Sequence, residues 1–425
     1  MKLVCGPDGF VPSGSGDSLR VILYGQPAQE GDGSAGEAVK SEIHRKRLDP
    51  AQRAWDLLSI ALSVMAADAA VLRKQSPDGW TREIELDIAV TDAAFWNLQA
   101  EALADVLAFL TTDRWVLRFR EGGLHPTPPR HPVMPDHDCA VLFSGGLDSL
   151  VGVIDLATAG RKPYAVSQIV RGDADKQVDF AARIGGMVGH LQLNHNAKVP
   201  GSQEISQRAR SFIFITFGVL AATTLLRYHY GEHIPLYVCE NGFIAINPPL
   251  TGCRLGSLST RTAHPEFLGR FQCVLDAAGL RVAISNPYGA MTKGEMLTRC
   301  ADQELLKTMA VRSTSCGRFQ HYNYHHCGRC VPCQVRRAAF LAWGSIPDTT
   351  DYVFDSLGSD NADHSGFDDV RSVAVALAAV RDEGADAWLG HALSSPLIGD
   401  RAALLGMLER GLEEVRALHD TYGVR

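Results

Sequence analysis

The chain has 425 residues, 46% of them hydrophobic and 21% charged, and it carries a net charge of −7. This composition is typical of a globular protein of two or three domains. The negative charge disfavours nucleic acid as a partner, although a local basic groove would be compatible with it. The first residues do not resemble a signal peptide, and the most apolar run, from Phe212 to Leu226, is shorter than a membrane span. We therefore expect a cytoplasmic protein without a membrane-spanning segment.

Residues 1–121 predict an N-terminal α+β domain, because strand and helix patterns follow each other along this part of the chain. Asp49 is expected to cap the first helix and Pro50 to begin it, since the missing proline N–H would be unpaired there. No catalytic cluster is visible in this domain, which favours a scaffold or a partner-docking role. The predicted strands cover residues 18–24, 82–90 and 114–120, the predicted helices residues 50–72 and 95–110, and a Gly-rich acidic loop residues 25–37.

Two further boundaries divide the rest of the chain. Five prolines within residues 122–137 predict a linker, because proline lacks an N–H donor and restricts the residue before it. Residues 346–425 predict a helical C-terminal extension, with a loop over residues 355–367 and helices over residues 368–381 and 401–422. Core packing is the favoured role of these helices, and a partner interface is the alternative.

Residues 138–345 predict an α/β domain with a doubly wound parallel sheet, because strand and helix patterns alternate regularly there. Such sheets bind ligands beyond the carboxyl ends of their strands. The predicted strands cover residues 139–142, 163–170, 190–194, 234–239 and 281–285, and the predicted helices residues 150–157, 173–188, 208–228 and 269–278.

A Gly-rich turn between the first strand and helix of this domain predicts a phosphate-binding site. Its glycines let backbone N–H groups approach an anion, and the following helix directs its free N–H groups and positive dipole end to the same place. Two serine hydroxyls add donors, whereas an ionised Asp148 would bind backbone N–H groups or Mg²⁺. The turn comprises Ser144, Gly145, Gly146, Leu147, Asp148 and Ser149.

Four clustered cysteines, Cys316, Cys327, Cys330 and Cys333, predict a metal site. Four thiolates suit tetrahedral Zn²⁺, but the spacing also permits an iron–sulfur cluster or a redox dithiol. A site with four protein ligands has no open position, so we expect a structural role that holds residues 313–337 against the sheet. Three histidines in the same loop are expected to be surface residues rather than ligands; they are His321, His325 and His326.

The Gly-rich turn resembles the signature of the PP-loop ATP pyrophosphatases, which bind the pyrophosphate of ATP and form adenylates. The segment from Cys327 to Phe340, together with Cys316, resembles the zinc signature of 7-cyano-7-deazaguanine synthase. The segments Lys293–Met296 and Arg210–Phe214 resemble two further motifs of that family, so the resemblance extends from Cys139 to about Trp343. The enlarged chain is most similar to the synthase-like proteins of bacterial anti-phage operons of the Qat type.

The sequence departs from the family pattern near the expected substrate pocket. Arg171-Gly172-Asp173 replaces an aromatic-Gly segment, and the stretches at residues 240–244 and 259–265 differ from the housekeeping pattern. These departures put the identity of the final acceptor in doubt.

The resemblance implies a PP-loop fold, similar to the adenine nucleotide alpha hydrolases, and the activity of an ATP-dependent C–N ligase. The implied reaction adenylates 7-carboxy-7-deazaguanine and forms an amide and then a nitrile, with ATP, Mg²⁺ and Zn²⁺ as cofactors. Asp148, Lys293 and Arg210 are the implied catalytic residues. The residues proposed for substrate binding are Glu240, Asn241, Arg261 and His264, although a histidine at a helix start is commonly structural.

Several alternatives remain open at this stage. The activated deazaguanine could be attached to an amine of a protein partner from the same operon rather than to ammonia. A PP-loop tRNA-modifying enzyme such as a thiolase would need catalytic cysteines, for which only Cys239 and Cys253 are available nearby. A glutamine-dependent ligase would need a glutaminase domain, which we do not find. A non-catalytic ATP-sensing subunit of a defence complex would bind ATP without releasing pyrophosphate.

Overall fold

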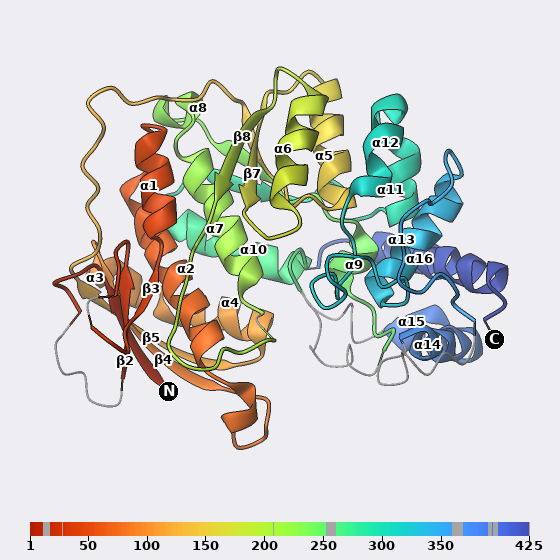
Figure 1. Cartoon of the computed structure of the whole chain (residues 1–425), viewed down its shortest axis with the longest axis horizontal. Helices are drawn as coiled ribbons and strands as arrows, with labels where there is room; N and C mark the ends of the chain where they lie inside the picture. The colour runs from red at the N-terminus through yellow and green to blue at the C-terminus, as the bar shows by residue number, and fades with distance from the viewer. Residues whose placement is uncertain are drawn as a thin grey trace.

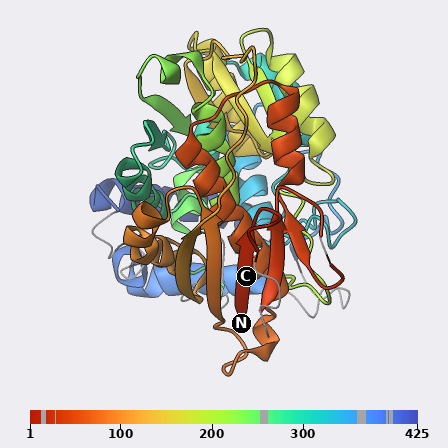
Figure 2. The ribbon, with the colours of Figure 1, turned by 90° about the vertical axis from the view of Figure 1, so that its left-hand side faces the viewer.

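The computed structural model describes residues 1–11, 18–27, 29–206, 208–251, 261–358, 369–389, 393 and 398–424. This part of the chain contains two five-stranded sheets and a group of C-terminal helices. The N-terminal sheet and the C-terminal helices lie at opposite ends of the long axis, with the second sheet between them (Figure 1). In the side view, the N-terminal strands lie below the yellow strands of the second sheet (Figure 2).

The N-terminal sheet has the strand order β3-β2-β1-β4-β5, and each neighbouring pair is parallel. The domain is therefore α/β rather than α+β, because its helices carry the chain back across the sheet between strands, which an alternating pattern alone does not reveal. The sequence pattern did not predict two strands: β1, at the start of the chain, and β3, which is short and lies in the Gly-rich segment. The strands are β1 (Lys2–Gly6), β2 (Leu19–Leu23), β3 (Gly33–Ala35), β4 (Glu83–Val90) and β5 (Arg114–Glu121).

The central helix of this domain, α2 (Gln52–Ala70), is almost entirely buried because it packs against β4 on one side and against α7 (Arg210–Ala222) on the other. The expected cap was wrong: Ala51, in an extended conformation, precedes the helix, and its N–H donates to Thr223 Oγ1 at 3.3 Å. No side chain of the described segments caps the first turn of α2, and the contact with Thr223 instead holds the residue before the helix against the second domain. The other helices of the domain are α1 (Glu37–Arg45), α3 (Ala93–Leu98), α4 (Ala100–Thr111) and the 3₁₀ turn η1 (Arg73–Gln75).

The second sheet has the order β10-β9-β6-β7-β8, and all of its pairs are parallel, which confirms the predicted α/β domain. The chain adds β7 and β8 on one side of β6 and then β9 and β10 on the other. The carboxyl end of β6 is therefore a topological switch point, where ligands of such sheets bind. The strands are β6 (Cys139–Leu142), β7 (Pro163–Gln168), β8 (Gly189–Leu193), β9 (Ile234–Tyr237) and β10 (Val282–Ser285).

Helices cover both faces of the second sheet. Successive residues of β6 point to opposite faces of the sheet. Val141 packs in a core with α5 and α6, and Leu142 packs in a core with α7 and α10. The helices of this domain are α5 (Leu147–Thr158), α6 (Ala174–Ile184), α7, α8 (Leu226–His229), α9 (Gly242–Ile246), α10 (Pro265–Ala277), α11 (Lys293–Arg299), α12 (Gln303–Met309), the 3₁₀ turn η3 (Ala310–Arg312) and α13 (Val331–Trp343).

The long helix predicted over residues 208–228 is divided into α7 and α8. The hydroxyls of Thr223 and Thr224 donate to the carbonyls of Leu220 and Ala221, at 2.8 and 2.7 Å, and Leu225 adopts an extended conformation. Threonine side chains that bond to nearby carbonyls compete with helix continuation. The periodic apolar pattern could not show this break.

One continuous core joins the N-terminal domain to the α7 side of the second sheet, since it contains residues of α2, α4, α7 and α10. The boundary proposed within residues 122–137 therefore separates two stretches of sequence, but it does not separate two hydrophobic cores. The C-terminal helices α14 (Asp369–Glu383), α15 (Ala385–Leu389) and α16 (Arg401–Thr421) form another core with α9 and α13. Residues 359–367 of the predicted C-terminal loop lie outside the described residues. Within the described part of the chain, no helix is long and apolar enough to cross a membrane.

Candidate active site

The Gly-rich turn joins the carboxyl end of β6 to α5, as predicted, and α5 begins inside it at Leu147. Gly145 has φ = +87°, which favours glycine, and a Cβ on Gly146 would lie 3.1 Å from both Ser144 Oγ and Thr314 O. Ser144 Oγ accepts from the Gly146 N–H at 3.2 Å. The first-turn N–H groups of α5 have no partner within the helix, so the turn presents donors to an anion.

A cavity of about 340 Å³ opens beside this turn. Its walls come from six separate segments of the chain that meet at the switch point of the sheet. The cavity is lined by Ser144, Gly146, Leu147, Asp148, Ser149, Asp173, Cys239, Glu240, Ile244, Lys293, Thr314, Ser315, Cys316, Gly317 and Pro332. The structure thus brings together the turn, Lys293, Glu240 and one of the clustered cysteines.

A buried ion pair between Asp148 and Lys293 lies at one wall of the cavity. Asn241 donates to Asp148 Oδ2 from its side chain at 2.7 Å and from its backbone N–H at 3.2 Å. Burial raises the pKa of Asp148, but the charge of Lys293 and these hydrogen bonds outweigh it and lower the pKa to about 2. Asp148 is therefore ionised at neutral pH. Asn241 is fully buried and holds Asp148, and it is not among the residues that line the cavity.

Glu240 lies at the end of β9, beside this pair. Burial and the negative charge of Asp148 raise the pKa of Glu240 well above its ordinary value of 4.5. Two neighbouring carboxyl groups with pKa values displaced in opposite directions are typical of functional sites. The site can therefore hold one ionised and one neutral carboxyl group at the same pH.

The raised pKa of Glu240 makes a prediction about stability. A carboxyl group that binds its proton more tightly in the folded state stabilises the fold fully below its unfolded pKa, and this contribution is lost as the pH rises through the folded pKa. Glu240→Gln has no proton to lose. We therefore expect its free energy of unfolding, relative to that of the original chain, to increase between about pH 4 and about pH 7. Urea titrations across this range measure the difference.

Glu295→Gln is the control with the opposite sign. Burial acts to raise the pKa of Glu295, but Arg410 and the backbone N–H of Thr292 lower it overall. Its contribution to stability is present above the unfolded pKa of about 4.5 and lost as the pH falls through the lower folded pKa, so the relative stability of Glu295→Gln should decrease as the pH rises to about 4.5 and then stay constant up to pH 7. A stability difference for Glu240→Gln that does not change with pH would contradict the assigned shift.

The C-terminal helix α16 fixes the position of Lys293. Lys293 is the first residue of α11, which Thr292 and Glu295 begin with a capping box. Glu414 of α16 accepts hydrogen bonds from the Thr292 hydroxyl and, at 3.3 Å, from the Gly294 N–H. A Cβ on Gly294 would lie 2.5 Å from Glu414, so only glycine permits this approach. Glu414 could not be singled out from the sequence, because it is one acid among several on an amphipathic helix.

Thr314, which the sequence did not single out, also lines the cavity and lies beside the turn. Its N–H donates to Gly145 O at 3.1 Å, and its hydroxyl donates to Asp173 Oδ1 at 2.6 Å. Asp173 also pairs with Lys176 at 2.8 Å, and Gln177 donates to Ser144 O at 3.0 Å. The departure from the family pattern at Asp173 thus lies directly at the cavity.

The four cysteines form one buried cluster, with all of their sulfur atoms within 4.8 Å of one another. The Sγ–Sγ distances of Cys316–Cys330 and Cys327–Cys333 are both 3.9 Å, close to the ~3.8 Å that Zn–S bonds of ~2.3 Å give in a tetrahedron. Backbone N–H groups donate to Cys316 Sγ and Cys327 Sγ at 3.3 Å, as second-layer groups commonly do to thiolate ligands. The cluster suits zinc.

The nearby histidines make other contacts: His321 and His325 are exposed as expected, but His326 is buried and the expectation of a surface residue was wrong there. His326 Nε2 accepts from the Ser315 N–H at 3.1 Å, and His325 pairs with Asp351 at 3.2 Å. Among the described residues, the metal-binding group comprises the four cysteines without a histidine. Because Cys316 lines the cavity and Thr314 bonds to the turn, the cluster holds one wall of the candidate active site in place.

Besides Asn241, three further residues predicted to act in catalysis or substrate binding lie outside the lining of this cavity. Arg210 is exposed at the start of α7, and Arg261 Nη1 donates to Phe109 O of α4 at 3.0 Å. His264 caps α10: its Nδ1 accepts from the Glu266 N–H at 3.2 Å, and burial with the charge of Arg261 lowers its pKa to about 4. The contacts of His264 are those of a structural histidine.

Cys239 borders the cavity but is not suited to be a reactive thiol. Burial, followed by the charges of Asp155 and Asp148, raises the pKa of Cys239. A Cβ on Gly152 would lie 2.3 Å from its sulfur, so the thiol is packed against α5. Cys253 lies outside the described residues. The geometry gives no support to a catalytic cysteine at residue 239.

A doubly wound parallel sheet with this turn after its first strand is the fold of a PP-loop protein. Residues 262–344 match the family model described as "Queuosine biosynthesis protein QueC", so this segment is similar to that family. The matched residues include Lys293 and the four cysteines but not the Gly-rich turn.

The similarity to curated proteins is more extended. The chain is 25% identical over 236 residues to the 7-cyano-7-deazaguanine synthase of Methanothrix thermoacetophila, covering 50% of this chain and 96% of that protein. The synthase of the same name from Rhizobium etli is 26% identical over 244 residues, covering 50% and 90%. That from Syntrophobacter fumaroxidans is 24% identical over 257 residues, covering 51% and 96%. The resemblance seen in the motifs is confirmed.

Proposed function

We propose that the chain is an ATP-dependent C–N ligase that adenylates the carboxylate of 7-carboxy-7-deazaguanine and converts it to a nitrile, in the cytoplasm. The observation that carries this proposal is the cavity where the phosphate-binding turn, the Asp148–Lys293 pair and Glu240 meet. The name shared by the relatives, 7-cyano-7-deazaguanine synthase, supplies the substrate class.

The proposed reaction consumes two molecules of ATP. A carboxylate oxygen attacks the α-phosphorus of ATP, the bond to pyrophosphate breaks, and an acyl adenylate forms. Ammonia attacks the acyl carbon, and AMP and a proton leave to give the amide. The amide oxygen then attacks the second ATP, and loss of pyrophosphate, AMP and the amide protons gives the nitrile.

The residues of the cavity have separate roles in this proposal. The N–H groups of the turn and of the α5 start stabilise the charge that develops on pyrophosphate, as preorganised donors do. Lys293 neutralises phosphate charge, and Asp148 orients its ammonium group. Asp148 is an ionised carboxylate that could hold Mg²⁺ beside the triphosphate, whose charge the ion would neutralise. The neutral form of Glu240 can both donate and accept a hydrogen bond toward the deazaguanine base.

Zn²⁺ at Cys316, Cys327, Cys330 and Cys333 takes no part in the chemistry of this proposal. Four cysteine ligands leave no open position for substrate. Its contribution is to hold the segment with Thr314 against the turn.

A pyrophosphate-release assay over a set of carboxylated deazapurines tests the proposal. We expect release that depends on 7-carboxy-7-deazaguanine, and a product with the mass of the nitrile when ammonia is present. ATP binding without pyrophosphate release for every carboxylate would contradict the proposal and favour an ATP-sensing subunit.

A protein amine is the second candidate acceptor, in line with the similarity to anti-phage proteins. The observation that favours it is the size of the chain: the relatives cover only about half of it, while α16 reaches Lys293 and α4 contacts Arg261. Intact mass measurement of a protein from the same operon, incubated with the enzyme, ATP and 7-carboxy-7-deazaguanine, tests this version. If the protein stays unmodified while free nitrile accumulates, the protein-amine version is contradicted and plain synthase activity is favoured.

A further inference from the structure

The N-terminal domain contacts the connection between β8 and α7 (residues 194–209) along much of its length. Asn196 Oδ1 accepts from the N–H groups of Gly36 and Ala38 at the start of α1, both at 3.1 Å. Lys198 pairs with Ser34 of β3 through two backbone hydrogen bonds of 2.9 and 2.8 Å. The connection is thus bound to the edge of the N-terminal sheet before it reaches α7.

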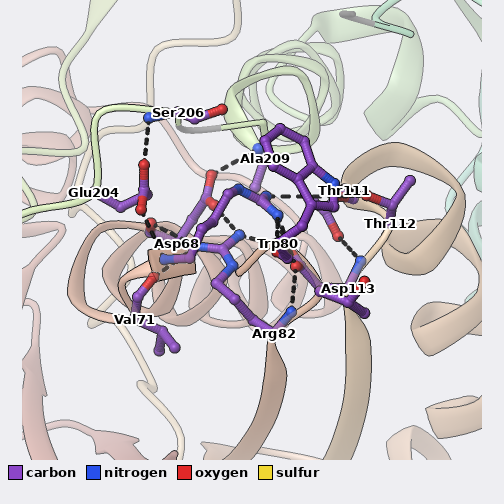
Figure 3. A network of polar contacts seen from close by, with 12 residues as sticks. Asp68, Val71, Trp80, Arg82, Thr111, Thr112, Asp113, Glu204, Ser206 and Ala209 are labelled. Carbon is purple, nitrogen blue, oxygen red and sulfur yellow. Dashed lines mark hydrogen bonds and ion pairs between the residues drawn. The ribbon is translucent and has the colours of Figure 1, made fainter. Parts of the chain in front are cut away.

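A buried ion network within the N-terminal domain lies beneath the end of this connection (Figure 3). Arg82 bonds to Asp68 at 2.6 Å and to Asp113 at 2.5 Å, and Arg73 bonds to Asp113 at 2.9 Å. Two guanidinium groups thus face two carboxylates. Pairing of opposite charges makes such buried groups tolerable and gives the network a fixed geometry, although the Nε atoms of Arg73 and Arg82 have no hydrogen-bond partner within the residues that the structure describes.

The network extends to the connection itself. Asp68 Oδ2 accepts from the N–H of Ala209, the residue that precedes α7, at 2.8 Å. Glu204 Oε2 accepts from the Arg73 N–H at 2.8 Å, and the Glu204 N–H donates to Ala69 O at 2.8 Å (Figure 3). The start of α7 is therefore held by α2 and η1 of the N-terminal domain.

Arg210 follows directly after this anchored segment. It begins α7, which packs on β6 and β7. Burial of His195 and, to a lesser extent, the positive charge of Arg210 lower the pKa of His195 to about 4. His195 comes just after the carboxyl end of β8. Because the connection from the carboxyl end of β8 leads into α7, the start of α7 belongs to the ligand-binding edge of the sheet, and Arg210 is not among the residues that line the phosphate cavity.

We propose that Asp68 and Glu204 are positioning residues through which the N-terminal domain sets Arg210 for the carboxylate substrate and not for ATP. The inference rests on the proposed function, because it assigns the substrate side to the start of α7. It explains why the first 121 residues share a core with α7 instead of forming a separate body.

Glu204→Ala is the decisive variant, because Glu204 is only partly buried and its removal should not prevent folding. The matched control is Glu83→Ala, which removes an exposed carboxylate that pairs with Arg114 at 3.0 Å on the outer face of the same domain. We expect Glu204→Ala to raise KM for 7-carboxy-7-deazaguanine about tenfold and to change KM for ATP less than about twofold, whereas Glu83→Ala changes neither. Asp68→Asn, if it folds, should raise KM for 7-carboxy-7-deazaguanine more than Glu204→Ala does and should again change KM for ATP little.

Hydrogen exchange provides a readout that does not depend on the substrate. Glu204→Ala should accelerate exchange at the first amides of α7 and leave those at the start of α5 unchanged. A KM for the carboxylate equal to that of the original chain would overturn the positioning role. If the original chain shows no carboxylate-dependent pyrophosphate release, the proposed function fails; faster exchange at α7 in Glu204→Ala but not in Glu83→Ala would then still support positioning, and equal exchange would overturn it.

Discussion

Lys293→Met is expected to lower the rate of pyrophosphate release on the order of 10²–10³-fold, the loss typical of removing one preorganised charge-stabilising group. The ammonium group of Lys293 lies at the cavity wall beside the turn and pairs with Asp148. Its removal leaves the ionised Asp148 carboxylate buried without its counter-charge, so we also expect a loss of about 3–5 kcal/mol in the free energy of unfolding. Pyrophosphate release and urea unfolding measure the two effects.

The double variant Asp148→Asn with Lys293→Met separates chemistry from folding. Both charges are absent, so most of the lost stability should return, while pyrophosphate release stays low. Lys307→Met is the matched control: Lys307 pairs with Glu304 at 2.8 Å on the surface of α12, where an ion pair contributes about 0–1 kcal/mol. Recovery of activity in the double variant would contradict the role of this pair in the reaction.

The second large effect is expected at the cysteine cluster. Purified protein should contain about one zinc per chain, and Cys330→Ser should lose it, because structural zinc contributes on the order of 10 kcal/mol of local binding free energy. Release of the segment that carries Thr314 should then open the cavity wall and abolish pyrophosphate release. Metal analysis by mass spectrometry and the pyrophosphate assay measure both outcomes.

Cys273→Ser is the control for this variant, because Cys273 is an exposed free cysteine on α10. It should keep its zinc and its activity. Iron and sulfide in place of zinc would show that the iron–sulfur alternative is correct, and a zinc content unchanged in Cys330→Ser would contradict the ligand set.

Local patterns were sufficient to predict the parts of the site that lie close together in sequence. The turn at residues 144–149 and the cysteine run after Cys327 both carry their chemistry within a few residues, so their spacing reports their geometry. All five strands of the second sheet were predicted, because buried parallel strands are short apolar runs separated by helices.

The remaining contacts of the site join residues far apart in the chain. Glu414 reaches Thr292 across 122 positions, and Thr314 reaches Asp173 across 141. No spacing rule applies at such separations, and both acids resemble ordinary surface residues in sequence. The class of the N-terminal sheet was missed for a related reason, since strand pairing and direction depend on the path of the connections.

The predicted substrate residues illustrate a further limit. A motif fixes the type of residue but not the atom that it contacts: Asn241 holds Asp148 from behind the cavity, and Arg261 and His264 contact Phe109. Arg210, Arg261 and His264 thus lie where the N-terminal domain meets the second sheet. Their roles toward the substrate stay predictions.

The most direct test of adenylation uses 7-carboxy-7-deazaguanine labelled with ¹⁸O in its carboxylate. If a carboxylate oxygen attacks the α-phosphorus of ATP, displacement of the adenylate by an amine leaves that oxygen on AMP. We therefore predict that mass spectrometry will find one ¹⁸O atom in the AMP and none in the pyrophosphate. Label in inorganic phosphate with formation of ADP, or AMP without label, would contradict the assignment of this cavity as an adenylating centre.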